Sequence, residues 1–198
     1  VAPEPPDLFI ETSATPTGTP YDHTIASNSD DASEVVATTV NRGTSRVADN
    51  SGASSGVDPT DEIALWSFPN VQTTTCSAAT LTLYHRIDSS PDPGNFMVVY
   101  AESQAAAPSS QWGAANAPIL SGSTPVAATV TEAASPVGYH AITVTTLIQQ
   151  VMATANFALG NRINLWAQLL PGSPSCFLQI GDVSNPGAGT PARLQITP

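Results

Sequence analysis

The segment Tyr139–Phe157 (YHAITVTTLIQQVMATANF) changes its hydrophobic period partway along, and this change limits the fold more than any other feature of the sequence. In Tyr139–Val144 the residues alternate, with Ile142 and Val144 on one face and smaller or polar residues on the other. Alternation in steps of two residues is typical of a half-buried strand. The sequence therefore predicts a strand that passes directly into a different element.

That element is a helix, which we predict over Thr146–Ala153. Thr146 and Gln149 have the spacing of a capping box at its start. Four apolar residues at helical spacing form one stripe along it: Leu147, Ile148, Val151 and Met152. A helix this short is not stable alone in water, so we expect it to pack on a β framework.

The rest of the sequence indicates strands, because short apolar or alternating runs are separated by turn-forming residues. We predict about nine or ten of them. The candidate runs are Val35–Val40, Arg46–Ala48, Glu62–Phe68, Ala78–Ile87, Phe96–Ala101, Val126–Thr131, Tyr139–Val144, Arg162–Leu170, Cys176–Ile180 and Arg193–Ile196. Their number and spacing predict an all-β fold, a jelly-roll β-sandwich with one short helix and an extended N-terminal arm.

The arm is predicted over residues 1–27, where prolines and threonines favour extended backbone, and the sandwich domain over residues 28–198. Three bulky apolar residues lie together within the arm: Leu8, Phe9 and Ile10. A solvated linker seldom carries such a group. Either the arm docks on a neighbouring subunit with these residues as an assembly anchor, or it folds back on its own domain.

The charge of the chain is strongly negative. Its 198 residues include five basic ones, all Arg, and sixteen acidic ones, for a net charge of −11. Such a surface repels phosphate backbones and anionic head groups, so we expect no binding of nucleic acid. Only 11% of residues are charged, and solubility must come from hydroxyls, amides and surplus carboxylates.

No run of eighteen apolar residues exists, so no membrane insertion is predicted. The first residues, VAPEPPDLF, lack the basic and apolar regions of a signal peptide. The composition suits a location at a virion surface or in the extracellular space.

The two cysteines, Cys76 and Cys176, each precede a strand-like run. They could form a disulfide, which would stabilise the fold by about 4 to 5 kcal/mol in the chain-entropy model. The alternative is two small buried core residues. Neither cysteine has a second ligand at zinc-like spacing.

We expect no enzymatic activity and no catalytic residue. The three histidines, His23, His85 and His140, lie in no metal-binding spacing, and no nucleophile elbow is present. Turn chemistry explains Asp88 and Asp92 without a catalytic role. No cofactor is expected apart from a structural calcium, for which the candidate ligands are Asp30, Asp31 and Asp182. The alternative for these carboxylates is a solvated acidic patch.

Several aromatic residues could stack on sugar rings. Trp66 and Trp166 lie among apolar neighbours and are predicted to be core residues. Trp112 lies in a polar loop and is the candidate for an exposed platform, with Tyr139 as a second candidate. The alternative for Trp112 is a cover over the open end of a sandwich.

Several blocks occur in the order found in the DNRLRE-type β-sandwich domains, which the chain resembles from about residue 28 to its end. They are EIALWSFPN at Glu62–Asn70, CSAATLTLY at Cys76–Tyr84, Val98–Tyr100, Trp112, YHAITVTTLIQQ at Tyr139–Gln150 and PARLQIT at the close. The resemblance implies a jelly roll, used in polysaccharide-binding modules and in surface or particle-associated proteins. The basic side chains of that family's acidic-polysaccharide binders have few counterparts here.

Two functional hypotheses follow. The first is a non-enzymatic structural or decoration protein on a larger assembly such as a virus capsid, appendage or extracellular filament, with other protein subunits as partners and an oligomeric state. The second is a carbohydrate-binding module that recognises a neutral polysaccharide. Fold resemblance alone does not decide between them.

Overall fold

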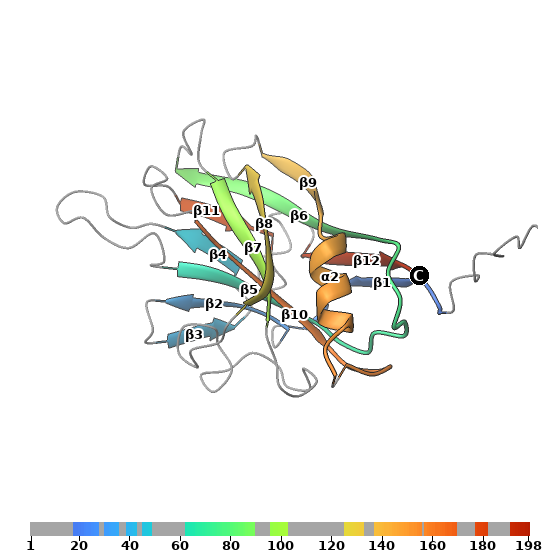
Figure 1. Cartoon of the computed structure of the whole chain (residues 1–198). Coiled ribbons are helices and arrows are strands. Elements are labelled where there is room, and N and C mark those ends of the chain that lie inside the picture. Colours follow the sequence, from blue (N-terminus) through green and yellow to red (C-terminus); the bar gives the residue numbers. More distant parts are fainter. Residues whose placement is uncertain are drawn as a thin grey trace, which may run out of the picture.

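The computed structural model describes residues 18–27, 30–35, 39–42, 45–48, 62–89, 96–102, 125–132, 137–155, 157–169, 177–181 and 191–198. This part of the chain holds twelve strands and one short helix (Figure 1). They are β1 (Tyr21–Thr24), β2 (Asp31–Val35), β3 (Thr39–Arg42), β4 (Ser45–Ala48), β5 (Glu62–Phe68), β6 (Ala78–Ser89), β7 (Phe96–Glu102), β8 (Pro125–Glu132), β9 (Gly138–Thr143), α2 (Thr145–Met152), β10 (Ile163–Leu169), β11 (Phe177–Ile180) and β12 (Arg193–Thr197). The predicted fold class, an all-β sandwich with one short helix, is confirmed.

The strands pair antiparallel in an order that does not follow the sequence. That order is β1-β12-β6-β11-β4-β5-β10-β7-β8, with β9 added beside β6, β2 beside β5, and β3 beside β2. The first strand therefore lies next to the last, as expected of a sandwich with long crossover connections. Among the described residues no helix is long and apolar enough to cross a membrane.

The main core lies between the inward faces of the strands. On β6 the residues Ala79, Leu81 and Leu83 are buried, while Thr80 and Thr82 between them are half-buried on the outward face. This is the alternation that the sequence predicts for a strand with one face on the core. Trp66 and Phe68 of β5 join the same cluster from across the sandwich.

Strands β5 and β10 are buried on both faces. Ile63 to Phe68 are all buried, as the continuous apolar run EIALWSF predicts. A second, smaller cluster forms on the face away from the main core, from Ile63, Leu65 and Trp166, with Tyr100 packed against it. The rings of Tyr100 and Trp166 stack there with centroids 5.3 Å apart. Both strand tryptophans, Trp66 and Trp166, are buried as predicted.

Helix α2 packs against β6, β7 and β8 (Figure 1). Its predicted stripe is confirmed, since Leu147, Ile148 and Val151 are buried and Met152 is half-buried. The predicted capping box is wrong. The cap position is Val144, without a side-chain hydrogen bond, and the Gln149 side chain instead donates to the Cys76 carbonyl oxygen at 2.9 Å.

Thr145, at the first helical position, explains this difference. Its Oγ1 accepts a hydrogen bond from the Ala79 backbone N–H at 2.9 Å, so the hydroxyl joins the helix start to β6. The backbone N–H of Val144 also donates to the Ala79 carbonyl oxygen at 3.0 Å. Bonds between strand and helix therefore replace a local cap.

The predicted boundary between arm and domain at residue 27 is too late. Tyr21–Thr24 is an edge strand in register with β12, and Ile25 is 2% exposed within the main core. The sequence did not predict this strand, because the prolines of the first segment indicate extended backbone and not sheet pairing. The anchor residues Leu8, Phe9 and Ile10 lie outside the described residues.

One further expectation differs from the structure. The run Val35–Val40, predicted as one strand, is divided between β2 and β3, which raises the number of strands above ten.

Cys76 is a free thiol packed against the core, and burial raises its pKa. Cys176 lies outside the described residues, so the pairing of the two cysteines stays a prediction.

Candidate functional site

The outward face of four adjacent strands, β1, β12, β6 and β9, carries the candidate site. Residues directly opposite each other on paired strands share a face of the sheet. One row across the four strands consists of Thr24, Arg193, Thr82 and Ala141. All four are half-buried or exposed, and their neighbours along the strands point into the core.

Two further rows flank the first. On one side lie Asp22, Gln195, Thr80 and Thr143, and on the other side lie Tyr84 and Tyr139. We call the side chains of these three rows the outer face. The outer face is polar and aromatic, because the side chains of these three rows are hydroxyl, amide, charged or tyrosine groups apart from Ala141.

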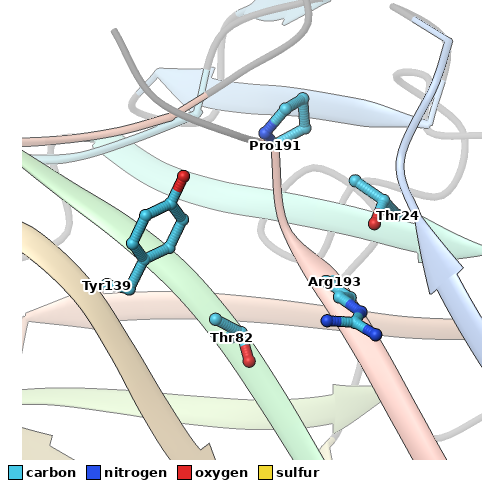
Figure 2. Close-up of a pocket in the computed structure, with 5 residues that line it drawn as sticks. All are labelled: Thr24, Thr82, Tyr139, Pro191 and Arg193. Atoms are coloured by element: carbon cyan, nitrogen blue, oxygen red, sulfur yellow. The ribbon is translucent and has the colours of Figure 1, made fainter.

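A pocket of about 410 Å³ opens on this face (Figure 2). Its lining consists of Thr24, Thr82, Tyr139, Pro191 and Arg193. Figure 2 shows these side chains, which come from β1, β6, β9, β12 and the short segment just before β12. We call it the face pocket. Its volume lies in the range of small-molecule sites, which combine apolar and aromatic side chains with a few placed polar groups.

Tyr139 supplies the aromatic part. Its side chain is 62% exposed, although it is a large hydrophobic residue. The ring meets that of Tyr84 edge to face, with centroids 4.9 Å apart and an angle of 70° between the planes. This contact with the neighbouring strand holds one side of the ring and leaves much of its surface open to a ligand.

The charged part is a bidentate ion pair. Arg193 Nε donates to Asp22 Oδ1 at 2.7 Å, and Arg193 Nη2 donates to Asp22 Oδ2. Gln195 Nε2 donates to the same Oδ2 at 3.3 Å. The hydrogen bond from Arg193 lowers the pKa of Asp22, so the carboxylate is ionised at neutral pH. The pair therefore carries no net charge while it presents donors and acceptors side by side.

None of the three histidines is among the described residues that line the face pocket. His85 is 1% exposed on the core side of β6, and its ring stacks on that of His140 with centroids 4.2 Å apart. Within the described part of the chain, neither ring nitrogen of His85 has a hydrogen-bond partner. His23 is half-buried and stacks on Tyr21 with centroids 5.9 Å apart.

The candidate calcium ligands are not brought together in the part of the chain that the structure describes. Asp30 is 7% exposed, and its Oδ1 accepts a hydrogen bond from Arg162 Nη1 at 2.7 Å. Asp31 begins β2, and Asp182 lies outside the described residues. No group of three or more His, Cys, Asp and Glu residues within the described ranges could hold a metal ion. The calcium site stays a prediction.

Of the two aromatic candidates, the structure places Tyr139 in the face pocket, whereas Trp112 lies outside the described residues. Sequence reasoning missed Asp22, Thr24, Thr82 and Arg193. The alternation in ARLQIT and in ATLTLY assigns Arg193 and Thr82 to outward faces. Only the strand order, which joins the start, middle and end of the sequence, shows that these faces form one surface.

Comparisons with known proteins give little more. No known family model matches the chain. No curated protein matches it either. A solved structure of Xylanase10C from Cellvibrio japonicus in complex with xylopentaose is similar over 90% of this chain and 29% of that one, with 8% sequence identity and a TM-score of 0.39. This chain thus spans less than a third of that protein's length, and a likeness at this TM-score carries no functional argument.

Proposed function

We propose that this chain is a carbohydrate-binding β-sandwich whose outer face binds a neutral polysaccharide. The observation that carries the proposal is Tyr139, a large ring left 62% exposed at a pocket whose other described lining residues are two threonines, an arginine and a proline. The CH-rich face of a sugar ring packs well on such an aromatic surface, while its hydroxyls need hydrogen-bond partners beside it.

The polar lining supplies those partners. Thr24 and Thr82 each offer a hydroxyl that both donates and accepts, and the guanidinium of Arg193 donates. Asp22 and Gln195 continue the polar surface beyond the pocket. A ligand rich in hydroxyls matches this mixture of donors and acceptors without carrying charge.

The proposed role is binding without turnover. The carboxylate of Asp22 is held ionised by Arg193, which makes it a poor general acid at neutral pH. The strands that carry the lining are antiparallel and in continuous register, as suits a preformed binding surface.

The test is the Tyr139→Ala variant in titration calorimetry against cello-, manno- and xylohexaose. Losing roughly 60 Å² of ring contact should weaken binding by about 1.5 kcal/mol, or about tenfold. Leu159→Ala is the matched control, because Leu159 is 60% exposed and does not line the pocket. Its affinity should equal that of the wild type. Unchanged binding by Tyr139→Ala, or no binding of any glycan by the wild type, would reject the proposal.

The decoration hypothesis depends on Leu8, Phe9 and Ile10, which lie outside the described residues. It stays a prediction, and the structure of the described part neither adds to it nor removes it.

A further inference from the structure

We propose that Asp22 is a specificity-determining residue, which restricts the face pocket to uncharged glycans by neutralising and positioning Arg193. This inference rests on the proposed carbohydrate-binding function. Asp22 does not line the pocket, so it would act through Arg193 and not by contact with the ligand.

The sheet register places the two side chains within reach of each other. Asp22 pairs with Gln195, and Thr24 pairs with Arg193, so Asp22 and Arg193 are diagonal neighbours on one face. Diagonal neighbours on paired strands are close enough for long side chains to meet. The outcome is a two-pronged contact from Nε and Nη2 of the guanidinium to both carboxylate oxygens. Such a contact fixes the plane of the guanidinium.

The charges lead to a clear consequence for ligands. Arg193 is the one charged side chain in the described lining of the face pocket. A guanidinium that faced the pocket without a carboxylate beside it would attract uronate sugars, because arginine recognises carboxylates through paired N–H groups. The Asp22 carboxylate already accepts from this pair of N–H groups, and it adds a negative charge beside the pocket.

The contact leaves three of the five guanidinium N–H groups for other partners. These donors can still bind sugar hydroxyls, and the Asp22 oxygens retain lone pairs that accept from them. A neutral sugar therefore meets a full set of partners. A carboxylated sugar must compete with Asp22 and approach a chain with a net charge of −11.

The experiment uses the full chain and four variants: Asp22→Asn, Arg193→Gln, the double variant, and Glu132→Gln. Asparagine has the shape of aspartate but no charge. Glu132→Gln changes the net charge equally on β8, at the opposite end of the strand order from β1. The probes are cellohexaose, manno- and xylohexaose as neutral ligands and hexagalacturonate as the anionic ligand. Melting temperatures report whether each variant is folded.

We expect the wild type to bind a neutral probe and not hexagalacturonate. Asp22→Asn should bind hexagalacturonate at least tenfold more tightly than the wild type in about 10 mM salt, and should lose most of that gain at about 0.15 M, where screening is stronger. The gain should disappear in the double variant and in Arg193→Gln, and Glu132→Gln should not show it. A purely structural role of Asp22 would not produce a gain that depends on Arg193 and on salt.

The inference is overturned if folded Asp22→Asn shows the wild-type ratio of neutral to anionic binding, if the wild type binds both classes equally, or if Glu132→Gln gains as much. In any of these cases a Tyr139-dependent affinity for neutral probes still supports the proposed function. If the wild type binds no glycan but Asp22→Asn acquires Arg193-dependent binding of hexagalacturonate, the proposed function fails and the assignment of Asp22 holds. If no variant binds any probe, both fail.

Discussion

Replacing His85 with Leu should make the protein more stable, although His85 is among its most buried residues. His85 is 1% exposed, and neither of its ring nitrogens has a hydrogen-bond partner among the residues that the structure describes. A buried polar group without a partner costs about 1–3 kcal/mol, and the imidazole has one donor and one acceptor in this condition. Losing the stacked contact with His140 removes about 0.5–1.5 kcal/mol of stabilisation. The net gain in the free energy of unfolding at neutral pH should therefore lie between about 0.5 and 5.5 kcal/mol.

The stability advantage of the His85→Leu variant over the wild type should grow as the pH falls. Burial, aided by the nearby His140, lowers the pKa of His85 from 6.5 to about 3. Above pH 6.5 the imidazole is neutral in both the folded and unfolded states and adds no pH dependence. Between pH 6.5 and about 3 only the unfolded chain takes up the proton, so stability falls by up to about 1.4 kcal/mol per pH unit. At pH 5 the variant should therefore gain about 2 kcal/mol more.

Urea unfolding followed by tryptophan fluorescence at about pH 7.5, 6 and 5 measures both effects. The control is His140→Gln, which removes the neighbouring ring but leaves His85 buried. Because burial is the larger cause of the shift, this control should retain most of the pH dependence between pH 7.5 and 5. The reasoning is refuted if the His85→Leu variant is less stable at pH 7.5 and shows the same acid dependence as the wild type, since His85 would then have a partner that stabilises it.

Two further predictions concern packing. Leu147→Ala should lower the free energy of unfolding by about 2–5 kcal/mol through the cavity it leaves, because Leu147 is 1% exposed in the main core; an unchanged melting temperature would show that the stripe of α2 does not hold the helix. Deleting residues 1–17 should leave the thermal transition nearly unchanged, whereas deleting 1–26 should lower it strongly by removing β1 and the buried Ile25. Equal transitions for the two deletions would contradict the placement of β1 in the sheet. The shorter deletion is also the one with which to test incorporation into an assembly.

Much of the fold could be predicted from hydrophobic period alone. β5 has the predicted bounds Glu62–Phe68, and β9, β10 and β12 lie within one residue or two of the predicted ones. These strands and α2 bury apolar residues at intervals that depend only on local geometry. Their burial dominates their stability, so local sequence carries enough information to locate them.

The rest depends on which elements become neighbours. The Thr146 cap was wrong because Thr145 bonds to β6, a partner 66 residues away in sequence. β1 could not be predicted because its stability comes from pairing with β12 and from Tyr21 and Ile25 entering the core. The outer face could not be predicted for the same reason. Local alternation shows that a residue points outward, but the strand order decides which other outward residues lie beside it.

The pairing of β1 with β12 also determines when the candidate site comes into existence. Asp22 and Arg193, which are 171 residues apart in sequence, meet only after the C-terminal strand has left the ribosome. Contacts of such long range close slowly, because the entropy of the intervening chain is lost before they form. A chain that stops before Arg193 would have Tyr139 and Thr82 but no guanidinium beside them. If the face binds a glycan as proposed, ligand capture would therefore report that β12 is present and paired with β1.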